Sequence, residues 1–333
     1  MTTLKSMLRL ASAALFALSP AIAITADYNW DIANEYQASS IHGEGDAYFA
    51  AKLKELSGGR IELTLHMGGA LGYKSKDHFD AVGDGAIPLA DSYTGAWQGF
   101  DPIFTMPALP FLAATVEEAY ALYQAAKPEY EKVFAENNQK LLYATAWPPS
   151  GMWGKKPLDS AEAINNLKIR TYDPNGTKTL VAANAAPIQL SWTDVVPQLS
   201  TGGIDAVLTS AEGGVNAKFW EHLNHFTEIN YALPLSMVHM NLDEYNALSD
   251  DLKQAVDEAA AATEKFNWDG LVNRRKNNYA TMQENGVTVV TDVSPEYLAF
   301  LAKAGEVALN DWLEKMGERG EKIIADYKQR TGK

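Results

Sequence analysis

The sequence predicts an α/β protein whose single chain is interwoven between two lobes. Strands and helices alternate from Tyr28 to Ala90 and again from Leu167 to Leu208, which is typical of parallel sheets. A helical pattern from about Asp250 to Glu284 would be about 50 Å long at 1.5 Å per residue, more than one lobe requires. The length also favours two lobes. Outside the N-terminal segment there is no repeat, low-complexity stretch or linker, so we expect the chain to cross between lobes more than once.

The N-terminus has the three parts of an export signal. Lys5 and Arg9 form a basic region, Leu10 to Leu18 an apolar region, and Ala21-Ile22-Ala23 a small-x-small cleavage site. The apolar region is too short to cross a bilayer as a stable helix. We therefore expect cleavage after about Ala23 and a soluble mature protein in a bacterial periplasm.

Composition excludes several classes of function. The 333 residues include no cysteine, so there is no disulfide framework, thiol nucleophile or thiolate metal site. The net charge is −14, and it becomes −16 when Lys5 and Arg9 leave with the signal. Such an acidic chain argues against nucleic acid or anionic lipid as a partner, although one buried arginine could still bind an anion.

The first half of the chain contains the elements of one α/β unit. A loosely alternating strand is expected at 28–35, and an amphipathic helix at 43–56 ends at the Ser57-Gly58-Gly59 C-cap signal. The period-two segment 60–66 predicts a strand. The remaining elements are a helix from the glycine-rich turn at 68–72 through Ala81, a buried strand at 86–90, an irregular three-proline segment at 101–112, a helix at 116–137 and a strand at 140–146.

The second half repeats this alternation. Trp147 begins a Pro-Pro-Ser-Gly turn, and a short helix at 160–165 leads to a strand that ends at Arg170. The elements expected after Arg170 are a helix at 176–184, an extended piece at 187–190, a helix at 193–199, strands at 204–208 and 235–241, the long helix, a strand at 287–290 and two amphipathic helices. We assign residues 24–146 with about 235–275 to the first lobe, and 147–234 with about 276–333 to the second.

Enzyme motifs are missing from the sequence. Of six histidines, only His222 and His225 lie close together, and at i, i+3 they could bind a metal from one helix face. The surrounding polar helix end favours a surface or capping role. There is no nucleophile elbow, P-loop, dinucleotide fingerprint or zinc-protease motif, so we expect no catalysis, metal or cofactor.

Aromatic residues and one arginine indicate a ligand pocket instead. Tryptophans and tyrosines gather at predicted strand ends and loops, where ligands bind in open α/β sheets, namely Trp97, Trp147, Trp153, Trp192, Tyr93 and Tyr172. Taken singly, each is more often a packing residue. Arg170 could clamp a carboxylate with its planar fork of donors, or it could pair structurally with Asp173 or an acid of the long helix.

Five segments resemble the TRAP transporter receptors, the periplasmic solute-binding components of tripartite ATP-independent transporters. They are the export signal, Lys155-Lys156-Pro157 to Arg170, Ala108-Leu109-Pro110-Phe111, Gly202-Gly203-Ile204-Asp205, and Tyr245 to Val256. The similarity covers nearly all of the mature chain, in order. It extends to the dicarboxylate-receptor-like members and in part to ectoine-type receptors.

The resemblance implies a periplasmic binding protein fold with crossing strands and a spanning helix, closing on one organic acid. It also implies the membrane subunits of a TRAP transporter as partner. By position, Arg170 matches the arginine that clamps the ligand carboxylate, and Trp192 matches an aromatic that packs on the ligand. Tyr93 matches a first-lobe contact, and Glu35-Tyr36 lies where ectoine-type receptors carry an acid for the cationic part of the ligand.

The chain departs from the family pattern at two positions. In Asp205 to Ser210, Thr209 replaces the asparagine that usually supports the carboxylate, and Ser150 replaces the second arginine of sialate receptors, which argues against sialic acid. The expected ligand-binding residues are Arg170, Trp192, Thr209, Tyr93, Glu35, Trp147, Ser150, Trp153, Tyr172 and Ser210.

Several alternatives stay open at this level. The aromatic residues and Glu35 would suit a zwitterionic, betaine-like or ectoine-like carboxylate, whereas a simple oxo, hydroxy, sugar or aromatic acid needs only Arg170. The binding protein of an ATP-driven importer would share the fold, and a periplasmic enzyme on the same scaffold is a further alternative. The sequence does not define the oligomeric state.

Overall fold

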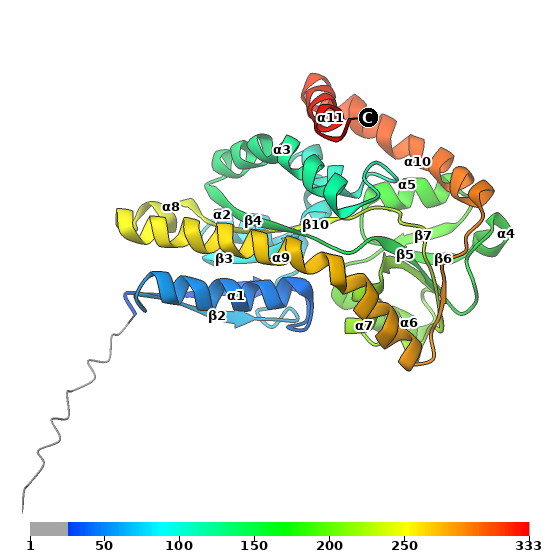
Figure 1. Ribbon diagram of the computed structural model, residues 1–333, viewed down its shortest axis with the longest axis horizontal. Helices are drawn as coiled ribbons and strands as arrows, with labels where there is room; N and C mark the ends of the chain where they lie inside the picture. The colour runs from blue at the N-terminus through cyan, green and yellow to red at the C-terminus, as the bar shows by residue number, and fades with distance from the viewer. Residues whose placement is uncertain (1–25, 333) are drawn as a thin grey trace, which may run out of the picture.

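The computed structural model describes residues 26–332 and has two lobes, each built on one β-sheet (Figure 1). This confirms the predicted fold class. The predicted signal peptide and its cleavage site lie outside the described residues. No helix within 26–332 combines the length and apolar character needed to span a membrane.

The first sheet has five strands in the order β2-β1-β3-β10-β4. Their bounds are β1 Tyr28–Asn34, β2 Ile61–His66, β3 Leu89–Tyr93, β4 Gln139–Ala146 and β10 Leu235–Asn241. The strands β2, β1 and β3 are parallel, and β10 runs antiparallel to both β3 and β4. Two apolar layers cover the sheet, one from α1 (Ile41–Leu56) and the start of the long helix α9 (Asp250–Glu284), the other from α2 (Ser75–Gly83) and α3 (Val116–Glu136).

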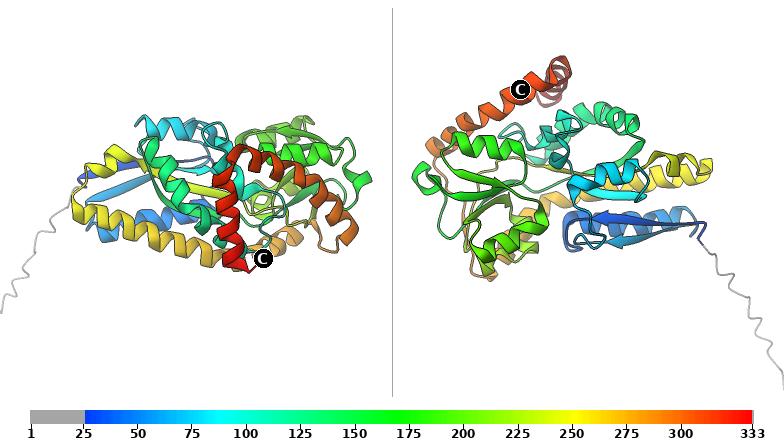
Figure 2. Two further views of the ribbon diagram at one scale, coloured as in Figure 1. Left: turned by 90° about the horizontal axis from the view of Figure 1, so that it is seen from above. Right: turned by 180° about the vertical axis from the view of Figure 1, so that it is seen from behind.

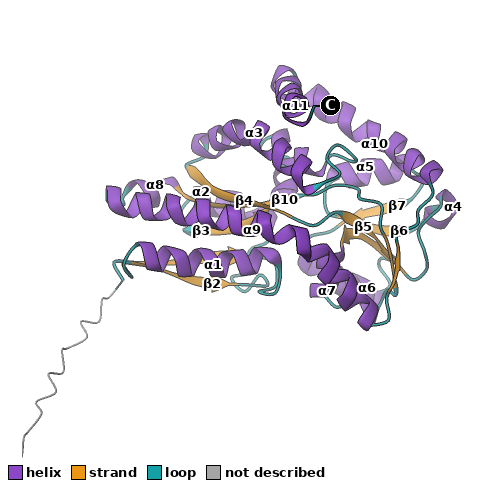
Figure 3. Cartoon of the chain, in the orientation of Figure 1, coloured by secondary structure: helices purple, strands orange, loops and turns teal. Residues whose placement is uncertain are grey.

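The second sheet has six strands in the order β11-β9-β5-β8-β6-β7. Their bounds are β5 Ser150–Gly154, β6 Lys168–Thr171, β7 Ala186–Gln189, β8 Ala206–Ser210, β9 His225–Thr227 and β11 Thr288–Val290. The short helices of this lobe are α4 (Ala161–Ile164), α5 (Pro174–Ala182), α6 (Val195–Thr201) and α7 (Ala211–Asn216). Helices enclose the strands of both lobes (Figure 3).

The chain crosses between the lobes at four described places. It passes from β4 to β5, returns from β9 to β10, crosses again in α9 (Asp250–Glu284), a helix of 35 residues, and returns a last time between the two closing helices. Early residues of α9, such as Val256, pack in the core of the first lobe, whereas Met282 packs in the core of the second. The predicted crossing strands and spanning helix are therefore confirmed (Figure 2).

The two closing helices pack against different lobes. The helix α10 (Pro295–Met316) packs against α5 of the second lobe. In contrast, α11 (Glu318–Thr331) packs against α3 of the first lobe, where Ile323 and Tyr327 join the apolar core. The reason is the turn at Gly317, whose positive φ of 54° redirects the chain toward the first lobe.

Some local predictions were wrong. The Pro-Pro-Ser-Gly segment was predicted as a turn, but Ser150 begins strand β5, in which Gly151 allows close packing because an added Cβ would lie 2.4 Å from the Phe226 ring. The three-proline segment forms a 3-10 helix, Pro102–Ala108. The metal-binding alternative for His222 and His225, which the sequence disfavoured, has no shared helix face, because His222 follows the 3-10 turn Phe219–Glu221 and His225 begins β9.

Candidate functional site

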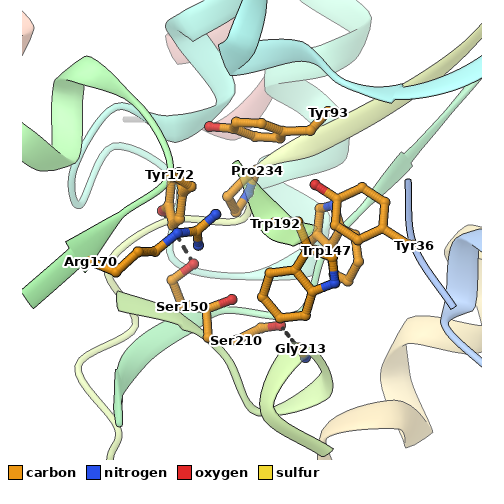
Figure 4. Close-up of a pocket in the computed structure, with 11 residues that line it drawn as sticks. Tyr36, Tyr93, Trp147, Ser150, Arg170, Tyr172, Trp192, Ser210, Gly213 and Pro234 are labelled. Atoms are coloured by element: carbon orange, nitrogen blue, oxygen red, sulfur yellow. Dashed lines mark hydrogen bonds between the residues drawn. The ribbon is translucent and has the colours of Figure 1, made fainter. Parts of the chain in front are cut away.

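A pocket with about 350 Å³ of empty space lies between the lobes, where strands of both sheets end. Its walls come from the carboxyl ends of β1, β3, β4, β6 and β8, from the crossing segments, and from the 3-10 turn Trp192–Asp194 and α7. Carboxyl strand ends are the usual ligand position in open α/β sheets. The lining residues are Tyr36, Tyr93, Trp147, Ser150, Arg170, Tyr172, Trp192, Thr209, Ser210, Gly213 and Pro234 (Figure 4).

Arg170 is the one charged side chain among these lining residues. It is 3% exposed, and its Nε and Nη2 donate to the Leu190 carbonyl at 3.1 and 3.0 Å, while Nη1 lies 3.5 Å from the Leu208 carbonyl. No carboxylate within residues 26–332 lies within ion-pair distance of its guanidinium, so the structural pairing with Asp173 or with an acid of α9 is not formed. Burial lowers the pKa of Arg170, although a guanidinium keeps its charge in proteins.

Aromatic rings enclose the space in front of Arg170. The guanidinium carbon lies 5.7 Å from the ring of Trp192 and 5.8 Å from that of Tyr172, both within cation–π range. Tyr36 meets the edge of Trp147 at 4.6 Å between ring centroids and lies 5.8 Å from Trp192. The pocket therefore combines one cation with apolar, flat walls, an arrangement suited to a small anion that carries apolar surface.

Hydroxyl groups supply the remaining polarity. Tyr172 Oη donates to Ser150 Oγ at 3.2 Å, and Ser210 Oγ accepts from the Gly213 amide at 3.1 Å as the N-cap of α7. The hydroxyl of Thr209 makes no hydrogen bond to another residue of the described chain, which leaves it free to bind a ligand. These groups are neutral, so they can orient a ligand without changing the charge of the site.

Eight of the ten predicted residues line this pocket, and Glu35 and Trp153 do not. Glu35 is buried beside an adjoining interlobe cavity, and its two oxygens accept from the amides of Ser75 and Thr193 at 2.9 and 3.2 Å. Trp153 is fully buried in the core of the second lobe, where its ring packs against Phe219 and its Nε1 donates to the Ser210 carbonyl. Glu35 therefore joins the lobes and Trp153 supports the pocket wall from behind.

Three lining residues were not among the predicted site residues. Tyr36 was noted only as the neighbour of Glu35, although its place after an alternating strand could have indicated a pocket role. Gly213 leaves room that any side chain would fill, since an added Cβ would lie 2.8 Å from Thr209 Oγ1. Pro234 belongs to the segment that crosses from β9 to β10, and nothing in its local sequence indicates a ligand contact.

The two lobes touch each other around the pocket. Tyr93 Oη of the first lobe donates to Asp173 Oδ2 of the second at 2.9 Å, and Lys74 pairs with Asp194 at 2.8 Å. Asp173 also caps α5 by accepting from the Gly176 amide, and burial raises its pKa to about 6. These contacts hold the lobes in a closed arrangement.

Within the described chain, no group of three or more His, Cys, Asp or Glu side chains is arranged to hold a metal ion. The site instead has a closed interlobe cavity, one unpaired buried cation and neutral walls. Two lobes that close around such a cavity define a solute-binding receptor.

Comparison with known proteins identifies the family. The model of the bacterial extracellular solute-binding protein family 7 matches residues 32–315, and the chain belongs to this family of TRAP transporter receptors. It is therefore a solute receptor and not an enzyme, and it is not the binding protein of an ATP-driven importer.

Individual relatives align with this chain over about 90% of its length. The ectoine-binding periplasmic protein TeaA of Halomonas elongata is 25% identical over 314 residues, 90% of this chain and 89% of TeaA. The structure of DctP6, a Bordetella pertussis receptor binding pyroglutamic acid, has a TM-score of 0.87 and 29% identity, covering 90% of this chain and 99% of DctP6. A marine metagenome receptor specific for pyroglutamate has a TM-score of 0.86 and 30% identity, covering 90% and 98%.

Proposed function

We propose that this TRAP receptor holds a small organic monocarboxylate on Arg170 and delivers it to TRAP membrane subunits. The observation that carries the proposal is the buried Arg170 guanidinium without a carboxylate partner. A buried charge is costly unless it is paired and hydrogen bonded. A ligand carboxylate would supply that pair.

The donors left on Arg170 fit a bidentate carboxylate. A guanidinium has five N–H donors, and Arg170 directs two of them to Leu190 and one to Leu208. One hydrogen on each of Nη1 and Nη2 remains, and a carboxylate can accept such a pair in the parallel fork geometry. The free hydroxyl of Thr209 would add a neutral donor, in the role that the family pattern gives to asparagine.

The charge of the pocket favours a monoanion. A dicarboxylate would bring a second negative charge into walls whose described residues offer no second cation. The acid predicted for a cationic ligand group, Glu35, is already hydrogen bonded across the lobes and lies outside the pocket lining. We therefore favour a small carboxylate with a neutral polar group, of the class that pyroglutamate represents in two relatives.

Two observations support a zwitterionic ligand as a second candidate. The ring faces of Tyr36, Trp147 and Trp192 could hold a cationic group by cation–π contact, and two relatives are ectoine-binding proteins.

Isothermal titration calorimetry with L-pyroglutamate, succinate and ectoine tests the ligand class. We expect L-pyroglutamate to bind more tightly than the other two. If succinate bound most tightly, the proposal of a singly charged ligand would be wrong. If ectoine bound most tightly, the zwitterionic candidate would be the better one.

Substitution of Arg170 tests the clamp. We expect Arg170→Ala to weaken binding at least about 30-fold, because removing one partner of a buried charged pair costs on the order of 2–5 kcal/mol. Arg170→Lys should weaken it about 10-fold or more, since an ammonium lacks the fork. Arg60→Ala, at a partly exposed arginine, is the control. Unchanged affinity of Arg170→Ala would refute the role of this residue.

A further inference from the structure

A second polar network joins the lobes beside the ligand pocket, and it centres on Glu212 of α7. The Glu212 side chain is 1% exposed. Its carboxylate accepts from the Ile41 amide at 2.9 Å, from Arg274 Nε at 2.8 Å and from Asn278 Nδ2 at 2.7 Å. Arg274 Nη2 and Asn216 Nδ2 add hydrogen bonds at 2.9 and 3.3 Å. So many donors on one buried carboxylate indicate a fixed position for α7.

Arg274 extends the network to the first lobe. Its Nη1 donates to Glu44 Oε2 at 2.9 Å, and its Nη2 donates to the Ser39 carbonyl at 2.9 Å. The hydroxyl of Ser39 donates to Asn216 Oδ1 at 2.9 Å. Three segments therefore meet here, the start of α1 from the first lobe, α7 from the second, and the middle of the spanning helix α9 (Figure 1).

The same segments line the ligand pocket on their other side. The helix α7 starts at its N-cap Ser210, and both Ser210 and Gly213 are pocket residues. In the first lobe, the pocket residue Tyr36 lies three residues before Ser39. A ligand that fixes Tyr36 against Ser210 would bring the two halves of the network together as well.

We propose that Glu212 and Arg274 are positioning residues that form an interlobe latch, which holds the receptor closed and slows release of its carboxylate ligand. When the lobes separate, the hydrogen bonds of this network to α1 or those to α7 must break. A buried ion pair adds little to overall stability because desolvation offsets its attraction, but it can select one arrangement of the parts it joins. The latch rests on the proposed closure around a carboxylate, and its contacts are separate from Arg170.

Interlobe distances measured by pulsed electron spin resonance test the latch. The chain has no cysteine, so Asp80→Cys on α2 and Val181→Cys on α5 would place one spin label on each lobe. We expect Arg274→Gln and Glu44→Gln to shift the distribution toward longer distances, with or without L-pyroglutamate. Glu44 is half exposed, so its variant should fold normally. Arg275→Gln, at the next residue of α9, is the control, and its distance distribution should equal that of the parent.

Release kinetics provide the second measurement. The release rate of L-pyroglutamate should rise at least about fivefold in Arg274→Gln, which corresponds to about 1 kcal/mol, while the association rate changes little. Distance distributions and release rates that equal those of the parent would overturn the latch. Failure of L-pyroglutamate to bind the parent would count against the proposed ligand, and the distances without ligand would still decide on the latch.

Discussion

Asp46 and Asp91 form a buried carboxyl pair behind the aromatic wall of the pocket. Asp46 is fully buried, and it accepts from Asn34 Nδ2 at 2.7 Å and from Tyr143 Oη at 3.0 Å. Asn34 Nδ2 also lies 3.4 Å from Asp91 Oδ2, so one amide contacts both carboxyl groups and two negative charges there would repel each other. Burial raises the pKa of Asp46 to about 7 and the pKa of Asp91 well above its usual range.

This pair makes stability depend on pH. The folded state keeps protons that an unfolded aspartate releases near pH 4, so stability is lost as the pH rises from about 4 toward 7. Asp46→Asn removes one of these protons. Relative to the parent, its free energy of unfolding should rise with pH by up to about 1.4 kcal/mol per pH unit. Urea denaturation from pH 5 to 8 measures this.

The control for this titration is Asp80→Asn, at an exposed position of α2, which should show the pH dependence of the parent. A constant difference between Asp46→Asn and the parent over the whole range would mean that the pair carries no extra proton.

How far single residues can be predicted depends on their partners. The position of Arg170 in the pocket lining was predictable because it ends a strand of an α/β sheet, where pockets usually lie. Glu35 and Trp153 have the right residue types near the right strand ends, but their partners come from distant segments. Thr193 lies 158 residues from Glu35, and Phe219 closes over Trp153 from another turn. Only the tertiary structure shows that these two side chains lie outside the lining of the ligand pocket.

Among the elements, α1 and α9 pack unusually closely. An added Cβ at Gly45 of α1 would lie 2.4 Å from the side chain of Asn267 in α9. Asn267 is itself buried and donates to Thr145 Oγ1 at 2.7 Å, so it cannot move aside without losing that bond. This contact fixes the spanning helix against the first lobe, two turns of α9 before the latch residue Arg274.

We expect Gly45→Ala to lower the free energy of unfolding by about 1–3 kcal/mol, because overpacking outweighs the better helix propensity of alanine. Gly270→Ala, inside the partner helix α9, is the matched control, since an added Cβ there meets nothing within 4 Å. It should gain up to about 1 kcal/mol. Equal effects of the two substitutions in guanidinium titrations would show that α1 and α9 can separate freely.

Elements with a clear period were predictable, and those that depend on other segments were not. The long helix α9 and the strand β2 have their expected type and nearly their expected bounds. The strand β5 was missed because its start reads as a turn, and its register comes from β8 and β9 on either side. The strand β9 has only three residues, and its pairing with β5 and β11 defines it.

At the scale of the whole molecule, the lobes share their cores through the crossing segments. The helix α9 is buried in both lobes, and α11 returns from the second lobe to the first. Two of the connections between the lobes begin or end in β4 and β10, which are hydrogen-bonded neighbours in the first sheet. The sheet therefore holds these two connections side by side. Opening must therefore bend the connections without unfolding either lobe, and neither lobe is a continuous stretch of chain.

This shared architecture predicts that the two lobes unfold in one transition. Phe134→Ala in the first core and Phe226→Ala in the second each remove a fully buried ring, at a cost of about 3–5 kcal/mol. Because the cores are linked, each substitution should lower a single calorimetric midpoint, by roughly 5–8 °C for a chain of this length. The calorimetric and van't Hoff enthalpies should agree in the parent and both variants. A second peak that separates in only one variant would show that the lobes are independent folding units.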